Sequence, residues 1–383
     1  MKISNTTDTS LNQYYLGIMS GTSLDGIDVA LVSISKNENK TIFIAGEEFS
    51  FDDDLRKKIL MLCETQTTSL QNLGEITSEL SLAYADAINL FLIKQKIDAK
   101  QIRALGCHGQ TVFHQPAGNN AFSMQLVDGA KIAANTHITT VTDFRSMDIA
   151  LGGQGAPLVP LFHQGLVEQV QAGVSESMVF LNIGGIANIS VVNPTPLSGF
   201  DTGPGNVLLD SWIYKISGKR YDKNGELSKK GKCNEKLLNL LLSEPYFDLT
   251  APKSTGRERF NLAWLESKLT LLNQKISDAD VMATLIALTC EPIIKALIDY
   301  PPGQLLVCGG GTKNKALMEY LKNALAQWQV KVTDDVGISA DYMEAMAFAW
   351  LAHRCINRLV GNEPQVTGAK RAEICGAITQ ILN

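Results

Sequence analysis

One aspartate stands alone among glycines in the stretch GFDTGPGN, residues 199–206. Such a run builds almost no core, because glycine has no side chain to bury and loses much backbone entropy on folding. Glycine does let backbone N–H groups approach a ligand closely, and concave nests of these groups favour anions. The aspartate in this nest, Asp201, would then act on something attached to the anion. Gly203 and Gly205 are the candidate anion contacts.

A second polar turn, SGTSLDGID at residues 20–28, lies between two apolar stretches. Asp-Gly is a strong signal for a tight hairpin, and on this segment alone a plain hairpin is the favoured interpretation. The other interpretation is a turn that grips a polyphosphate with backbone amides and hydroxyls, while Asp25 or Asp28 reaches a magnesium ion through water. The candidate nucleotide contacts in this turn are Gly21, Thr22, Ser23, Leu24, Asp25, Gly26, Ile27 and Asp28.

A third glycine-rich turn follows the apolar stretch LLVC. Bulky side chains there would block a flat ring, so Gly309, Gly310 and Gly311 are candidates for contact with an adenine or a ribose. The two hydroxyl-bearing turns, facing each other across a cleft, would hold the β- and γ-phosphates from both sides. No G-x-x-x-x-G-K-[ST] sequence occurs, which excludes a P-loop enzyme, and no H-R-D or D-F-G motif occurs, which excludes a protein kinase.

Polar side chains in three further stretches could line the same cleft. Cys107 beside His108 could form a thiol nucleophile with its base, but no cysteine-hydrolase signature surrounds them. The favoured interpretation is that His108 and Gln110 offer hydrogen bonds to a hydroxylated ligand. Arg145 suits a ligand carboxylate because its guanidinium is a planar fork, or else it forms a salt bridge between domains. Glu344, early in the helical pattern ADYMEAMAFAWLA, either favours the helix dipole or points into the cleft.

Rigid elements must hold these residues, and the apolar pattern predicts two similar halves. Residues 14–34 and 178–192 each read as two apolar strands joined by a glycine turn. Each half later adds a short strand that runs into glycine, at 102–111 and at 304–314, with helical patterns in between. The predicted fold is therefore α/β, with two domains and a cleft between them, where ligands commonly bind.

The composition is ordinary for a soluble globular protein of two or three domains, with 383 residues, 45% hydrophobic and 19% charged. The formal net charge is −5 and no cluster of lysine and arginine is long enough to track a phosphate backbone, so no nucleic-acid partner is expected. The N-terminus lacks the apolar stretch of a signal peptide, and the most apolar run, from Val281 to Cys290, is too short to span a bilayer. No C-x-x-C pair occurs among the seven cysteines, so no zinc ribbon or redox dithiol is expected, and the cysteines are interpreted as reduced thiols of a cytoplasmic protein. No membrane partner is expected.

Several long stretches occur in an order that is typical of one family. They are GIMSGTSLDGIDVAL, GCHGQTVFHQP, TDFRSMDIALGGQGAPLVP, NIGGIANIS, GFDTGPGN, CGGGTKN and ADYMEAMAFAWLA. Together they resemble the anhydro-N-acetylmuramic acid kinases, from about Leu16 to the closing VTGAKRAEICGAI. The resemblance implies the two-domain actin/hexokinase-like fold, a duplicated ribonuclease H-like fold with an interdomain cleft. The expected domains are residues 1–146 with about 365–383, and residues 147–364.

The resemblance also implies an activity, which is an ATP-dependent reaction on 1,6-anhydro-N-acetylmuramic acid in peptidoglycan recycling. The anhydro ring is hydrolysed and the oxygen on carbon 6 is phosphorylated, giving N-acetylmuramic acid 6-phosphate and ADP. It further implies that residues 21–28 bind ATP, that Asp201 is the catalytic base, and that Arg145 and Glu344 help bind the sugar. Mg²⁺, with ligands left open, and a homodimer are expected. The alternative is a kinase of the same superfamily for another amino sugar or a hexose, in which Asp201 deprotonates an existing hydroxyl.

Overall fold

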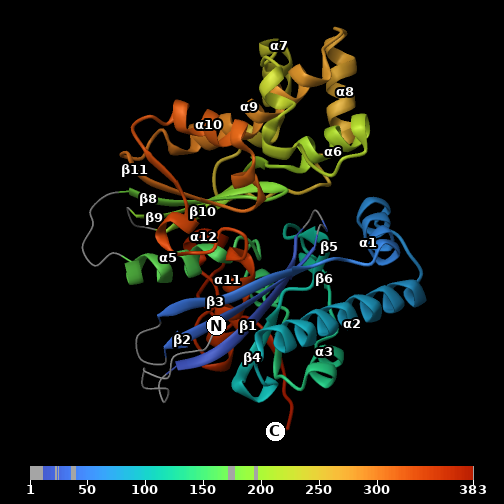
Figure 1. Ribbon diagram of the computed structural model, residues 1–383, viewed down its shortest axis with the longest axis vertical. Coiled ribbons are helices and arrows are strands. Elements are labelled where there is room, and N and C mark those ends of the chain that lie inside the picture. The colour runs from blue at the N-terminus through green and yellow to red at the C-terminus, as the bar shows by residue number, and fades with distance from the viewer. Residues whose placement is uncertain are drawn as a thin grey trace.

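Two β-sheets form the frame of the computed structural model, which describes residues 12–21, 24, 26–35, 40–170, 177–193 and 197–382 (Figure 1). The first sheet has the strand order β13-β7-β4-β1-β2-β3 and the second has the order β10-β9-β8-β11-β12. The strands of the first sheet are β1 (Asn12–Ser20), β2 (Ile27–Ser35), β3 (Thr41–Phe49), β4 (Ile102–Cys107), β7 (Thr140–Thr142) and β13 (Ala377–Thr379). Those of the second are β8 (Ser177–Ile183), β9 (Ile186–Asn193), β10 (Ser198–Pro204), β11 (Gly303–Cys308) and β12 (Gln329–Val332).

The two sheets share one topology. In the first, β1, β2 and β3 form an antiparallel meander, after which β4 pairs parallel with β1 and β7 pairs parallel with β4. In the second, β8, β9 and β10 form the meander, after which β11 pairs parallel with β8 and β12 pairs parallel with β11. The α/β prediction of two similar halves is confirmed, and the fold is the two-domain actin/hexokinase-like fold.

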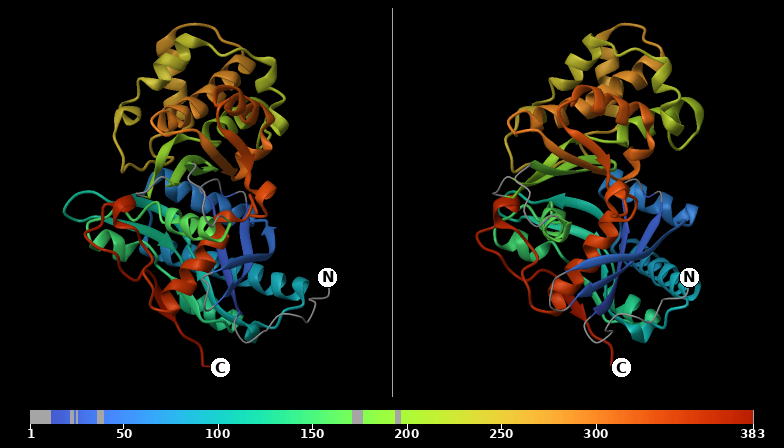
Figure 2. Two further views of the ribbon diagram at one scale, coloured as in Figure 1. Left: turned by 90° about the vertical axis from the view of Figure 1, so that its left-hand side faces the viewer. Right: turned by 60° about the vertical axis from the view of Figure 1, so that its left-hand side comes forward.

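Helices cover both faces of each sheet and divide the core into three layers (Figures 1 and 2). The outer face of the first sheet packs on α1 (Asp53–Thr65), α2 (Leu70–Gln95) and α3 (Gly129–Thr136). The outer face of the second packs on α6 (Val207–Ser217), α7 (Glu235–Leu242), α8 (Leu262–Leu272), α9 (Asp278–Leu297) and α10 (Lys315–Ala324). Smaller elements are the hairpin of β5 (Gln110–Gln115) and β6 (Phe122–Leu126), α4 (Ser146–Ala150) and α12 (Pro364–Thr367).

The middle layer consists of two helices that join the sheets, α5 (Val159–Val170) and α11 (Met343–Ile356). Helix α11 contacts β1, β2 and β4 of the first sheet, whereas α5 contacts β9 of the second, and the two helices contact each other. These two helices form one continuous apolar cluster with both sheets, so the packing marks no boundary between the domains. The positions of the domain limits therefore remain a prediction.

Short polar signals begin several of the helices. Asp52, Ser69 and Ser277 accept hydrogen bonds from N–H groups in the first turns of α1, α2 and α9. Such caps satisfy donors that have no partner inside the helix. Helix α2, of 26 residues, is the one helix in the described ranges with the length and composition to cross a membrane, and 50% of its apolar window is buried. Because α2 packs against α3 and β2, the core of the first half accounts for its apolar face.

Two glycines let α11 lie directly on the backbone of the first sheet. A Cβ atom added to Gly17 in β1 would lie 1.8 Å from the carbonyl oxygen of Ala345. A Cβ added to Gly106 in β4 would lie 2.0 Å from the carbonyl oxygen of Phe348. Backbone atoms cannot move aside as a flexible side chain can, so both positions need glycine to seat the helix that carries Glu344.

Replacing Gly17 with alanine is expected to lower the free energy of unfolding by about 3 kcal/mol, the upper end of the usual cost of overpacking. Gly74→Ala is the matched control, because Gly74 lies within α2 with no atom within 4 Å of an added Cβ. That change should stabilise the protein by about 0.5–1 kcal/mol, since alanine loses less backbone entropy than glycine in a helix. Urea unfolding measures both, and equal midpoints for the two variants would contradict the close approach of α11.

Candidate active site

Asp201 lies on β10, where a register shift interrupts the pairing with β9 between Asp201 and Gly203. One segment holds it by three hydrogen bonds. The Asp201 N–H donates to the carbonyl of Lys253 at 3.1 Å, and the Tyr246 hydroxyl donates to the Asp201 carbonyl at 2.7 Å. The Thr255 N–H donates to Asp201 Oδ2 at 2.9 Å. The carboxylate is thus fixed in place by residues that lie 45 to 54 positions further along the chain.

The surroundings of Asp201 shift its ionisation toward neutral pH. Burial raises the pKa of this carboxyl to about 7, and the nearby negative charges of Glu258 and Glu344 add to the rise. The Thr255 N–H and the Arg145 guanidinium lower the pKa, but by less than burial raises it. A carboxyl with a pKa near the working pH has the property that a general base needs.

Arg145 precedes α4 and is held on two sides. Its Nε and Nη2 atoms both approach Nε2 of His108, at 3.0 and 2.8 Å, and Nη1 donates to the carbonyl of Gly155 at 2.6 Å. A guanidinium has five N–H donors, so these three contacts leave one donor on each terminal nitrogen. In the described part of the chain no carboxylate lies within ion-pair distance of Arg145, so the structure does not support the predicted alternative of an interdomain salt bridge.

His108 supports Arg145 in its neutral form. Because Nε2 accepts from Arg145, the ring proton belongs on Nδ1, a buried atom that has no partner within the described ranges. Burial, together with the positive charge of Arg145, lowers the pKa of His108 well below its usual value. Gln110 is also buried, and its Oε1 accepts from Ser20 Oγ at 2.7 Å at the end of β1.

Glu344 lies in the first turn of α11, as the helical pattern predicts. Its Oε1 accepts a hydrogen bond from Nδ2 of Asn182 on β8 at 3.2 Å. Burial raises the pKa of Glu344, while Arg145 and Asn182 lower it. The negative charges of Glu344 and Asp201 also act on Arg145 without an ion-pair contact, so three predicted residues from separate segments lie in one region of the structure.

The turn between β1 and β2 is described only in part, since Thr22, Ser23 and Asp25 lie outside the described residues. Leu24 is buried with a φ of 52°, and its N–H donates to the carbonyl of Gly21 at 3.1 Å. Gly26 is tightly packed, because an added Cβ would lie 2.5 Å from Cγ of Glu48. Ile27 and Asp28 begin β2, so Asp28 is fixed by the ladder with β1 and β3.

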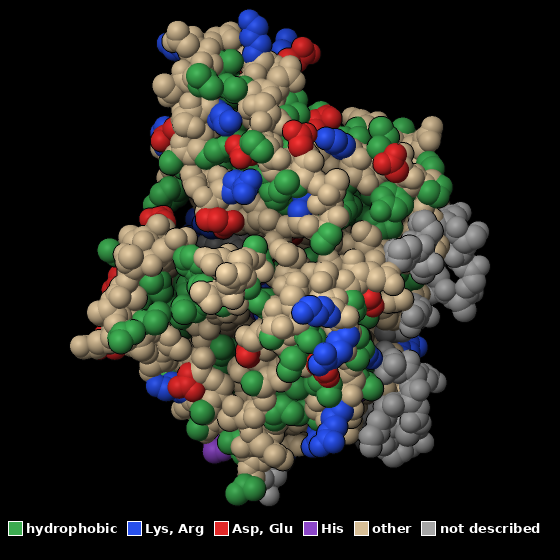
Figure 3. Space-filling model, turned by 180° about the vertical axis from the view of Figure 1, so that it is seen from behind, with side chains coloured by type: hydrophobic (Ala, Val, Ile, Leu, Met, Phe, Trp, Pro, Cys, Tyr) green, Lys and Arg blue, Asp and Glu red, His purple; other side chains and the backbone are tan. Residues whose placement is uncertain are grey.

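The glycines of the second half meet their neighbours closely. Added Cβ atoms would lie 2.7 Å from Phe247 at Gly203, 2.4 Å from the Gly184 carbonyl at Gly205, and 2.4 Å from Asn182 Oδ1 at Gly309. Gly311 is equally tight, with Ile183 at 2.4 Å, whereas Gly310 has no atom nearer than 3.7 Å. Packing therefore accounts for most of these glycines, whereas a side chain at Gly310 would meet its nearest neighbour, Asn206, at ordinary contact distance. The surface of the molecule is hollowed between its two halves when seen from behind (Figure 3).

The sequence profile described as anhydro-N-acetylmuramic acid kinase matches residues 13–381. A protein of that name from Pasteurella multocida is 51% identical over 369 residues, covering 95% of this chain and 96% of its own length. Another from Haemophilus influenzae is 49% identical over 379 residues, covering 96% and 97%. Component A of (R)-2-hydroxyglutaryl-CoA dehydratase from Acidaminococcus fermentans aligns with a TM-score of 0.46 at 12% identity, covering 89% and 98%.

The chain belongs to the anhydro-N-acetylmuramic acid kinase family. The matched residues, from 13 in β1 to 381, include every residue of the site described above. The thiol-nucleophile alternative does not suit this family member. Cys107 is fully buried, and burial raises the pKa of its thiol to about 12, so it stays protonated.

Sequence reasoning missed the segment that positions Asp201 in this kinase-family chain. Tyr246, Lys253 and Thr255 hold the aspartate, and Glu258 adds negative charge near it. The available signal was the polar run KSTGRER around Gly256, which resembles a ligand-binding loop in its composition but has no hydrophobic period.

Asp28→Asn is expected to raise the melting temperature at pH 8. Burial, with the negative charges of Glu48 and Glu344, raises the pKa of Asp28 to about 8. Between the unfolded pKa of about 4 and that value, the folded state binds the extra proton, so its stability falls as the pH rises. Asparagine carries no such penalty, and its advantage should grow from pH 4 to pH 8. Calorimetric scans at several pH values measure this, and an advantage that does not depend on pH would contradict the raised pKa.

Proposed function

We propose that this chain opens the anhydro bridge of 1,6-anhydro-N-acetylmuramic acid and phosphorylates it with ATP, giving N-acetylmuramic acid 6-phosphate and ADP. Membership of the kinase family makes it a phosphotransferase. The observation that supports the assignment of roles is that the charges of Asp201, Arg145 and Glu344, from three separate segments, act on one another. These residues supply a base, a cation with free N–H donors and a second carboxylate. Such a set suits a sugar that carries a carboxylate of its own.

Asp201 acts as a general base in this proposal. An anhydro sugar has no free hydroxyl on carbon 6, so the base takes a proton from water instead. The water oxygen bonds to the anomeric carbon while the bond from that carbon to the bridging oxygen breaks. The freed oxygen on carbon 6 then attacks the γ-phosphorus, and ADP leaves. General-base assistance of this kind contributes about 10²–10⁴-fold to the rate.

Arg145 binds the lactyl carboxylate of the sugar. Its two remaining N–H donors, one on each terminal nitrogen, match the two oxygens of a carboxylate. Glu344 and Asn182, which are hydrogen-bonded to each other, would add hydrogen bonds to the sugar. His108 and Gln110 act indirectly in this proposal. His108 accepts hydrogen bonds from Arg145, and Gln110 accepts one from Ser20 at the end of β1.

ATP lies across the turn formed by residues 21–28 and the glycines of the second half, Gly203, Gly205 and Gly309 to Gly311. Glu48, Glu344 and Asp341 add negative charge near Asp28, and Lys313, which pairs with Asp341 at 2.8 Å, offsets part of it, so a bound Mg²⁺ would offset the rest. No cluster of three potential ligands occurs in the described ranges, so phosphate oxygens and water would complete the coordination. Mg²⁺ supplies charge neutralisation on the phosphates, and positioning and electrostatics account for most of phosphoryl-transfer catalysis.

The value of kcat/KM is expected to rise with pH and then level off above about pH 7. Burial is the main cause of the raised pKa of Asp201, which is about 7, and only the ionised carboxylate can accept a proton. A pH–rate profile at low sugar and saturating ATP measures this. An inflection near the ordinary aspartate value of about 4 would contradict it.

The product formed in ¹⁸O water from ATP and the anhydro sugar tests the reaction. Mass spectrometry should find the label on carbon 1 and none on the phosphate. Unlabelled product kept in the same water corrects for exchange at carbon 1. Label on the phosphate would instead show that water attacks phosphorus and would contradict the proposed reaction. Turnover of N-acetylglucosamine in preference to the anhydro sugar would favour an ordinary sugar kinase.

The remaining assignments complete the proposal. The domains are residues 1–146 with about 365–383 and residues 147–364, and the chain acts as a cytoplasmic homodimer. Its partners are the sugar and ATP, without a nucleic acid or a membrane. The net charge of −5 supports the lack of a nucleic-acid partner.

A further inference from the structure

A buried carboxylate with no cation beside it lies next to the candidate active site. Asp148, in α4, is fully buried, and none of the ion pairs in the described ranges includes it. Neutral donors satisfy its oxygens instead. Asn362 Nδ2 donates to Oδ1 at 2.7 Å, Thr367 Oγ1 donates to the same oxygen at 2.6 Å, and the Gly155 N–H donates to Oδ2 at 2.7 Å. Burying a carboxylate without a paired cation is costly even when neutral donors satisfy its oxygens, so a position of this kind calls for a function.

Gly155 connects this carboxylate to Arg145. The N–H of Gly155 donates to Asp148, and the carbonyl of the same residue accepts from Arg145 Nη1 at 2.6 Å. Gly155 has a φ of 66°, and an added Cβ would lie 2.7 Å from Ile149, so the residue is tightly held. The negative charge of Asp148 also acts on the guanidinium of Arg145. Asp148 therefore fixes one of the two groups that set the direction of Arg145, and His108 is the other.

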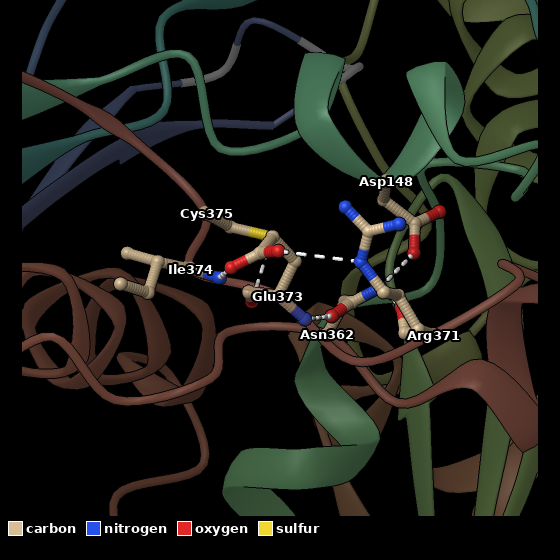
Figure 4. A network of polar contacts seen from close by, with 6 residues as sticks. All are labelled: Asp148, Asn362, Arg371, Glu373, Ile374 and Cys375. Carbon is tan, nitrogen blue, oxygen red and sulfur yellow. Dashed lines mark hydrogen bonds and ion pairs between the residues drawn. The ribbon is translucent and has the colours of Figure 1, made fainter.

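A segment near the end of the chain, residues 362–373, contacts Asp148, and Figure 4 shows Asn362 of this closing segment beside it. Asn362 donates to Asp148 and accepts from the N–H of Glu373 at 2.7 Å. Thr367 donates to Asp148, and its carbonyl accepts from the N–H of Gln154 at 2.8 Å. Residues 362–373 therefore enclose the carboxylate together with the loop that carries Gly155.

We propose that Asp148 is a positioning residue for Arg145, acting through Gly155, so that the closing segment supports the recognition of the sugar carboxylate. The inference rests on the proposed role of Arg145. With Gly155 fixed, Nη1 keeps one donor on its carbonyl and presents the other, beside that of Nη2, toward the ligand. Without Asp148, the Gly155 carbonyl loses its fixed place and the two free donors lose their common direction.

Asp148→Asn is the first test. The amide keeps the shape of the side chain, but it replaces one acceptor oxygen with a donor, so the N–H of Gly155 or the two donors at Oδ1 lose their partner. The KM for the anhydro sugar should rise about five- to tenfold, which at about 1.4 kcal/mol per decade corresponds to about 1–1.4 kcal/mol. The KM for ATP should change less than about twofold, because Asp148 has no part in holding the nucleotide.

Gly153→Ala is a second variant that keeps the charge, in case Asp148→Asn does not fold. An added Cβ at Gly153 would lie 2.2 Å from Asp148 Oδ2, so the methyl group pushes that oxygen away from Gly155. The same rise in the sugar KM is expected. Glu373→Gln is the matched control, since it makes the same carboxylate-to-amide change within the network. Its side chain contacts Arg371 and the Ile374 N–H but not Asp148, so its sugar KM should stay within about twofold of the wild type (Figure 4).

A double-mutant cycle with Arg145→Ala separates the two levels of the argument. Asp148→Asn should cause no further rise in the sugar KM once Arg145 has been removed. If Arg145→Ala itself leaves the sugar KM unchanged, the role of Arg145 in the proposed function is wrong and this inference fails with it. If Arg145→Ala raises the sugar KM but Asp148→Asn and Gly153→Ala do not, the inference alone is overturned. The same follows if Asp148→Asn raises the KM equally in both backgrounds.

Discussion

Asp201→Asn is expected to lower kcat by about 10²–10⁴-fold, the usual contribution of a general base. Asparagine keeps the shape of the side chain, and its amide oxygen can still accept from the N–H of Thr255. The bonds from Tyr246 and to Lys253 involve the main chain of Asp201 and are unaffected. Because burial raises the pKa of Asp201, the neutral amide should also leave the melting temperature equal or higher at pH 8. Single-turnover assays measure the rate, and calorimetry measures ATP binding.

Retention of more than about a tenth of the wild-type kcat in Asp201→Asn would contradict a general-base role of that size. A large loss accompanied by a lower melting temperature or by lost ATP binding would instead indicate damage to β10. Both readouts come from the same preparation, so the two causes can be told apart.

Arg145→Ala is expected to raise the KM for the anhydro sugar by about ten- to a hundredfold. In the proposed function its two free N–H donors form a bidentate contact with the lactyl carboxylate, and the loss of hydrogen bonds to a charged group costs roughly 1–3 kcal/mol. The KM for ATP should change much less, since the proposed nucleotide contacts lie on other turns. Initial rates over a matrix of sugar and ATP concentrations measure both constants.

Arg145→Lys is the graded control and should recover only part of the lost affinity, because a point charge cannot reproduce the planar fork. Lysine also cannot contact His108 and the Gly155 carbonyl in the same way as the guanidinium does. If Arg145→Ala disturbs the KM for ATP and for the sugar equally, or only lowers the melting temperature, Arg145 has a structural role instead.

The fold could be predicted from the sequence because its signals are local. The glycine turn between residues 183 and 186 and the apolar runs beside it predict the hairpin of β8 and β9, and the structure contains that hairpin. The run of apolar residues from Val281 to Cys290 predicts a buried helix and lies within α9. The helical spacing after Tyr342 likewise places Glu344 in a first turn. Each of these patterns depends on neighbours within a few residues.

The supports of the site could not be predicted in this way. Thr255 reaches Asp201 from a loop that lies 54 residues away in sequence, and Thr367 reaches Asp148 across 219 residues. Thr255 lies in an irregular segment, and Asp148 and Thr367 lie in helices of five and four residues, which are too short for a hydrophobic period to give their direction. The packing of the two halves decides such contacts, and a single sequence carries no direct sign of that packing.

Because α11 is seated on Gly17 and Gly106, the residues of the candidate active site fall into two groups, each fixed to one sheet. Glu344 is held against the first sheet by α11, whereas Asn182 and Asp201 belong to strands of the second. The 3.2 Å hydrogen bond from Asn182 to Glu344 therefore joins a residue carried by the first sheet to a strand of the second. A rotation of one sheet against the other would stretch this bond and separate Glu344 on α11 from Asp201, the proposed base, on β10. The proposed catalytic geometry would then be complete at only one angle between the two sheets.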